Sequence, residues 1–88
     1  MKKILLVEDN PADVLLTQRV FLQANIEAKI EVAEDGVKAL EMLEGTAEST
    51  AIDPVLILMD INMPRKNGKD VLKEIKASLH LRHIPVVM

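Results

Sequence analysis

The amino-acid sequence predicts an α/β fold in which helices cover a parallel sheet. Two observations predict it: two continuous apolar runs, residues 4–7 and 55–59, are each followed by carboxylates, and strand-like and helix-like segments alternate along the chain. Strands that are apolar on both faces belong in the middle of a parallel sheet. Alternation of strand and helix is typical of the same architecture. Both runs are therefore expected to be inner strands.

Length and composition limit the chain to one domain, residues 1–88, and favour a globular class. Hydrophobic residues make up 49% and charged residues 28% of the 88 residues. The net charge is −3 and Phe21 is the single aromatic residue, so neither a basic surface nor a stacking platform for nucleic acid is expected. The absence of cysteine excludes disulfides and thiolate metal sites. No apolar run suits a signal peptide or a membrane span, which predicts a cytoplasmic protein without membrane contact.

The first strand, residues 3–7, leads into a helix with clear start signals. Asn10 is a suitable N-cap, Pro11 fits the first helical position, and Asp13 lies near the positive end of the helix. Residues spaced by four positions predict the stripe of this helix that faces the core. The predicted stripe consists of Leu16, Val20 and Ala24, with Phe21 beside them.

The second strand, residues 28–33, alternates apolar and charged side chains, which indicates an edge strand. A second helix is expected to begin at Asp35-Gly36, with Asp35 as its N-cap. Its predicted core residues are Val37, Leu40 and Leu43. A polar loop over residues 44–53 follows and is longer than most connections in such folds.

The third strand, residues 55–59, precedes a loop containing Pro64 and the turn signal Asn67-Gly68. A third helix is predicted over residues 68–78, with Val71, Leu72 and Ile75 in the core. A fourth strand begins at Ile84 and continues to Met88 without polar alternation, which is typical of an inner strand. An open apolar edge favours aggregation, so we expect a longer domain, or another chain, to complete this strand.

Acidic residues follow two of the inner strands. Glu8 and Asp9 come after the first strand, and Asp60 comes after the third. Parallel strands place their carboxyl ends at one edge of the sheet, where open α/β sheets bind ligands. Three carboxylates brought together repel one another unless a cation joins them. Mg²⁺, which takes oxygen ligands, is the expected ion.

Taken together, these motifs resemble the receiver domain of two-component response regulators, in order and over the whole chain. The matching segments are Val7-Glu8-Asp9-Asn10, Asp35-Gly36 and Leu58-Met59-Asp60-Ile61-Asn62-Met63-Pro64 followed by Gly68. Residues 9–13 and 81–87, with the longer loop before the third strand, most resemble the single-domain phytochrome-associated subclass. The resemblance implies a flavodoxin-like (CheY-like) parallel sheet with strand order 2-1-3-4. The fifth βα unit is then missing, and the receiver domain is incomplete.

The resemblance also implies roles for individual residues. Asp60 would be the phosphoacceptor and would receive a phosphoryl group from a histidine kinase, of the phytochrome type in this subclass. Asp9, Asp60 and the backbone carbonyl of Asn62 would ligate Mg²⁺, and Glu8 would hold the ion through water. Such a chain is a phosphoacceptor rather than an enzyme, although it could catalyse its own phosphorylation and dephosphorylation. The family's switch Ser or Thr and its Lys would come after Met88 and have no counterpart.

Three alternatives stand beside this interpretation. A receiver-like interaction module or fragment, without a working phospho-switch, would be completed by a partner chain or by a homodimer that exchanges elements. A phosphohydrolase with an Asp nucleophile would need a second acid where Asn62 stands, and an amide cannot transfer protons. A calcium loop starting at Asp60 would need a ligand and a glycine where Pro64 and Arg65 stand.

Overall fold

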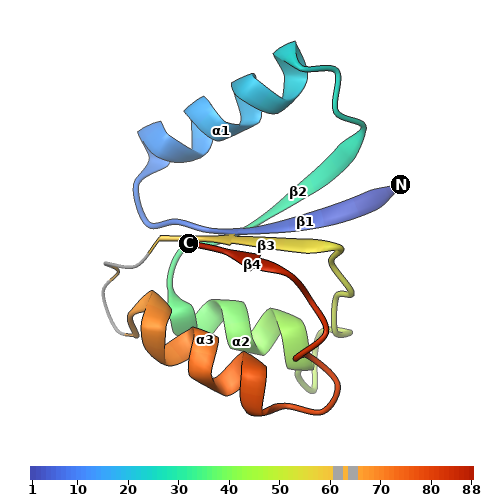
Figure 1. Cartoon of the computed structure of the whole chain (residues 1–88), viewed down its shortest axis with the longest axis vertical. Helices are drawn as coiled ribbons and strands as arrows, with labels where there is room; N and C mark the ends of the chain where they lie inside the picture. The colour runs from blue at the N-terminus through green and yellow to red at the C-terminus, as the bar shows by residue number, and fades with distance from the viewer. Residues whose placement is uncertain (61–62, 64–65) are drawn as a thin grey trace.

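A four-stranded parallel sheet organises the computed structural model, which describes residues 1–60, 63 and 66–88 (Figure 1). The strand order is β2-β1-β3-β4, as predicted. The strands are β1 (Lys2–Val7), β2 (Ala28–Ala33), β3 (Leu56–Met59) and β4 (Val86–Val87). The helices are α1 (Pro11–Gln23), α2 (Gly36–Glu44) and α3 (Gly68–Ala77). Helix α1 lies on one face of the sheet, and α2 and α3 lie on the other.

Each helix begins where the sequence provides a capping side chain. The Asn10 side chain accepts a hydrogen bond from a backbone N–H of α1 at 2.9 Å. The Asn67 side chain accepts one from a backbone N–H of α3 at 3.0 Å. The Asp35 carboxylate accepts the N–H of Lys38 at 2.8 Å in α2. These bonds satisfy donors that a helix start leaves without partners. The predicted caps Asn10 and Asp35 are confirmed.

The main core lies between the sheet and the α2–α3 layer. Leu5, Val7 and Ile57 are fully buried there against Val71 and Ile75. Alternate residues of a strand point to opposite faces, so the apolar runs of β1 and β3 supply this layer with every second side chain. The prediction that both runs are inner strands is confirmed. Within the described residues, no helix is both long and apolar enough to cross a membrane.

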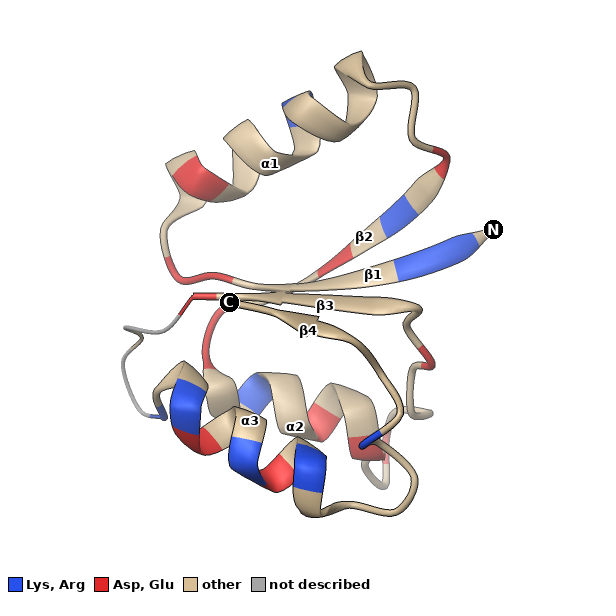
Figure 2. Cartoon of the chain, in the orientation of Figure 1, with Lys and Arg blue, Asp and Glu red and all other residues tan. Residues whose placement is uncertain are grey.

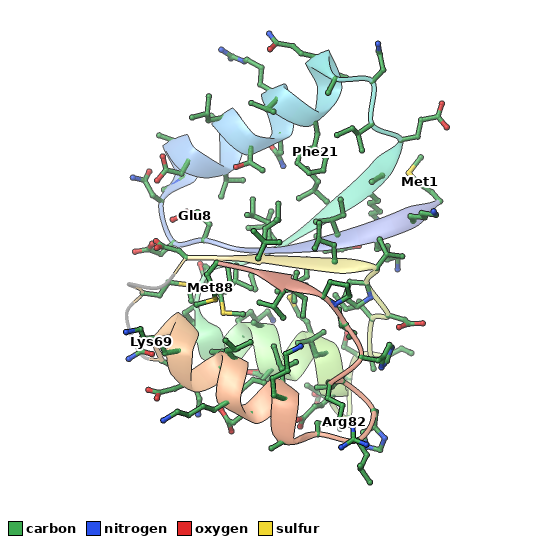
Figure 3. The ribbon with its side chains drawn as sticks, viewed as in Figure 1. Met1, Glu8, Phe21, Lys69, Arg82 and Met88 are labelled. Carbon is green, nitrogen blue, oxygen red and sulfur yellow. The ribbon has the colours of Figure 1, made fainter. Side chains whose placement is uncertain are left out.

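The predicted core stripe of α1 is wrong at Leu16, Val20 and Ala24, whereas Phe21 is half-buried. Leu16 and Val20 are 60% and 51% exposed, and Ala24, the C-cap, is exposed as well. Within α1, all of which lies in the described part of the chain, no residue is buried. The half-buried residues of α1 are Val14, Thr17 and Phe21, and Figure 3 shows Phe21 on the side of the helix that faces the sheet. Apolar side chains surround most of this helix, so a spacing of four positions could not identify the stripe that faces the sheet.

Smaller corrections concern the other elements. In α2 the fully buried residues include Ala39, whereas the predicted core residues Val37 and Leu40 are only half-buried. In α3, Leu72 is half-buried. The fourth strand is only Val86–Val87, because the Ile84 N–H donates to the Leu81 carbonyl in the preceding turn and Pro85 has no N–H to donate.

Shortening a core side chain of β3 is expected to destabilise the protein measurably. Ile57 is fully buried, so Ile57→Val should lower the free energy of unfolding by about 1 kcal/mol. Leu22 is 78% exposed, and Leu22→Ala should change it by less than about 0.5 kcal/mol. Urea denaturation followed by circular dichroism measures both. Equal losses of unfolding free energy in the two variants would contradict the location of the core.

Candidate functional site

The pairing of β1 with β3 determines where the acidic residues lie. Val7 stands opposite Met59 in the parallel register, so Glu8 and Asp60 follow a matched pair. The Asp60 N–H donates to the Val7 carbonyl at 3.1 Å, and the Glu8 N–H donates to the Ala33 carbonyl at 2.9 Å. Figure 2 shows acidic residues in red where β1 and β3 end, at the same edge of the sheet. These hydrogen bonds thus hold the backbone of Glu8 and of Asp60 against a neighbouring strand.

Glu8, Asp9 and Asp60 form one carboxylate cluster. Each contributes an oxygen, and these atoms all lie within 4.8 Å of one another. Glu8 and Asp60 are half-buried, and Asp9 is exposed. Three oxygen donors at this separation fit a hard divalent cation, which prefers carboxylates. The convergence that the sequence predicts is therefore present.

The surroundings of Glu8 make its negative charge costly. Burial raises the pKa of the Glu8 carboxyl above its ordinary value of 4.5, and the nearby Asp60 and Asp9 act in the same direction. The N–H of Asn10 donates to Glu8 Oε2 at 3.2 Å and partly offsets this increase in the pKa. A bound cation would remove the repulsion between these groups.

An open cavity of about 430 Å³ lies between α1 and the sheet and opens beside the cluster. Its lining residues are Leu6, Glu8, Asp13, Thr17, Leu58, Met59, Asp60, Val87 and Met88. A second groove of about 490 Å³ runs between α1 and β2, with Glu8 and Asp9 on its rim. Figure 3 shows Glu8 beside the loop that leads from β1 into α1. Asp60 therefore lines a cavity that is open to solvent.

Some predicted residues cannot be placed, and others were missed. Asn62 and Pro64 lie outside the described residues, so the proposed carbonyl ligand stays a prediction. Asp13 and Thr17 line the cavity but were not predicted as site residues. Their spacing of four in a helix that begins just after the acidic pair is the signal that could have identified them.

Comparisons with known proteins agree with the fold and the acidic motifs. A family model described as the response regulator receiver domain matches residues 4–88. Response regulator Rcp1 of Synechocystis is 42% identical over 88 residues, which cover 99% of this chain and 60% of Rcp1. The chain thus spans about three fifths of the length of this relative.

Solved structures of phytochrome response regulators are also similar. The bacteriophytochrome response regulator AtBRR has a TM-score of 0.92 and 42% identity, over 100% of this chain and 65% of that one. The Mn²⁺-bound form of Rcp1 has a TM-score of 0.90 and 41% identity, over 98% and 63%. The phosphorylated cyanobacterial regulator RcpA has a TM-score of 0.87 and 41% identity, over 97% and 61%.

Removing the charge of Glu8 should stabilise the metal-free protein at pH 7. A carboxyl whose pKa is raised in the folded state costs stability above that pKa, and the cost disappears below the unfolded value of 4.5. Because Glu8 is only half-buried, screening by water keeps the gain from Glu8→Gln small, on the order of 0.5 kcal/mol.

Thermal melting in EDTA at pH 7 and pH 4 measures this gain. The variant should melt above the wild type at pH 7 and level with it at pH 4. Adding Mg²⁺ should raise the Tm of the wild type more than that of the variant, since a ligand stabilises the state that binds it. A variant that melts below the wild type in EDTA at pH 7 would contradict a repulsion between Glu8 and the other two carboxylates.

Proposed function

The chain belongs to the response regulator receiver domain family, and on that premise we propose that it accepts a phosphoryl group from a histidine kinase on Asp60. The observation that carries the proposal is the convergence of Glu8, Asp9 and Asp60 within 4.8 Å at the end of two paired strands. We propose that these carboxylates hold Mg²⁺, with the backbone carbonyl of Asn62 as a further ligand and Glu8 acting through water.

Asp60 suits the role of acceptor because its backbone is held by a hydrogen bond and its side chain can be reached from a cavity. Its N–H is bonded to the Val7 carbonyl, and its side chain lines the cavity between α1 and the sheet. Asp9 lines the groove on the other side of α1 instead. This division supports Asp60 as the nucleophile and Asp9 as a group that holds the cation.

The proposed reaction transfers a phosphoryl group from a histidine nitrogen of the kinase to a carboxylate oxygen of Asp60. A carboxylate oxygen of Asp60 attacks the phosphorus of the kinase phosphohistidine, the P–N bond breaks, and its electron pair remains on the imidazole nitrogen. The bound cation would neutralise negative charge that otherwise keeps carboxylate and phosphoryl group apart. The aspartyl phosphate adds about one negative charge to the cluster. That increase is the signal a receiver can transmit.

The proposed partner is a histidine kinase of the phytochrome type. AtBRR and RcpA, which this chain resembles over nearly its whole length, are described as phytochrome response regulators. The same likeness supports a phosphoacceptor that catalyses only its own phosphorylation and dephosphorylation. Any activity that involves the remaining two fifths of such relatives is outside this proposal.

A second candidate function is an interaction module that works as a homodimer. Within the described residues, β4 pairs with β3 on one side only, and its Val87 side chain is 53% exposed. An open strand edge can pair with the same edge of a second copy. A dimer that persists on dilution in light-scattering measurements would support this candidate, and a monomer at all concentrations would exclude it.

Phosphoryl uptake should depend on Asp60 and on a divalent cation. Incubation with acetyl phosphate and Mg²⁺ should add the mass of one phosphoryl group to the wild type, as measured by intact mass spectrometry. EDTA or Asp60→Asn should abolish the adduct, and Asp9→Asn should slow its formation at least about tenfold, because the cation is then poorly held.

Asp53→Asn is the matched control, since Asp53 is an exposed carboxylate in the loop before β3 and lies outside the cluster. It should form the adduct like the wild type. No adduct on a wild-type chain shown to be folded by circular dichroism would favour the interaction module. An adduct that survives Asp60→Asn would exclude Asp60 as the acceptor.

A further inference from the structure

Gly36, the first residue of α2, is packed against the connection that joins β3 to α3. A Cβ placed on Gly36 would lie 2.5 Å from the carbonyl oxygen of Lys66 and 2.5 Å from Val71 Cγ2. Both distances are far shorter than any van der Waals contact. Figure 1 shows that α2 and α3 begin at the same edge of the sheet, where the acidic cluster lies. A side chain at position 36 would therefore collide with backbone close to the functional site.

Space, rather than backbone conformation, requires the glycine here. Gly36 is a helical residue, and its φ is not in the left-handed region that favours glycine. Ala is the better helix former. A glycine at this position therefore weakens α2 locally, and the close approach of the Lys66 carbonyl accounts for it.

Neither side of the contact can move freely. Before Gly36, the buried Asp35 side chain caps α2 through the N–H of Lys38. On the other side, Lys66 is held to α3 by an ion pair of 2.6 Å between its Nζ and Glu74 Oε2. The next residue, Asn67, caps α3. A displaced Lys66 carbonyl would thus disturb the start of α3 or move the connection itself.

The connection in question also carries the acceptor. Asp60 is fixed at its beginning by the hydrogen bond to Val7, and Met63 is buried in the core between Asp60 and Lys66. The chain from Asp60 to Lys66 is therefore held at three described points, of which Lys66 against Gly36 is the last. Because Met63 and Asp60 lie close to Lys66 in the sequence, we expect a displaced Lys66 to disturb their positions.

We propose that Gly36 is a positioning residue for the acidic site: its missing side chain lets the Lys66 carbonyl approach α2 and thereby sets where Lys66 lies relative to Asp60. The functional meaning of this inference rests on the proposed phosphoacceptor role. Its structural content is tested by cation binding, which does not require phosphoryl transfer.

The test compares Mn²⁺ affinity, measured by water proton relaxation, in four proteins: the wild type, Gly36→Ala, Val71→Ala and the double variant. Gly36→Ala introduces both collisions. The double variant removes the collision with the Val71 side chain and keeps the one with the Lys66 carbonyl. Val71→Ala alone leaves a cavity in the core at the same interface and therefore controls for lost stability. Thermal melts run in parallel confirm that each protein is folded.

We expect Gly36→Ala and the double variant to bind Mn²⁺ about tenfold more weakly than the wild type, as is usual when groups that support metal ligands are changed. Val71→Ala should melt lower yet bind Mn²⁺ like the wild type. Wild-type affinity in the double variant, or an equal loss in Val71→Ala, would overturn the positioning role. If the wild type binds Mn²⁺ but takes up no phosphoryl group, the proposed function fails while this comparison still decides the inference.

Discussion

The parallel register of β1 and β3 places like charges side by side, and the site depends on that constraint. Val7 pairs with Met59, so the residues that follow each strand emerge together. A slip of one residue would turn the buried side chains of a strand to the opposite face. Burial of Leu5, Val7 and Ile57 therefore holds Glu8, Asp9 and Asp60 within 4.8 Å despite their repulsion. A bound divalent cation is the simplest way to neutralise the repulsion within such a cluster.

The two faces of the sheet play different parts. The face covered by α2 and α3 contains the main core, and Gly36 lets Lys66 and Val71 pack closely against α2 there. Helix α1 covers the other face, and no side chain of α1 itself, which lies wholly within the described residues, is buried. The tightly packed side includes Met59, the residue before Asp60. The cavity on the α1 side is lined by Asp60.

Much of the fold was predictable because its signals are local. The apolar runs of β1 and β3, the alternation in β2 and the capping residues Asn10 and Asp35 each depend on a few neighbouring residues. The convergence of Glu8, Asp9 and Asp60 followed from the rule that parallel strands end at one edge. The sheet-facing stripe of α1 was not predictable, because its apolar residues surround the helix. Thr17 in the cavity and the space at Gly36 depend on how distant elements meet.

The most direct test of the central claim is a Mg²⁺ titration of the ¹⁵N-labelled protein followed by two-dimensional NMR. If the paired strands create one cation site, the largest amide shifts should occur at residues 8–10 and at Asp60. They should follow a single dissociation constant and disappear in Asp9→Asn. Shifts that follow different constants at Glu8 and Asp60, or that spread equally over exposed acids such as Asp53, would contradict a shared site.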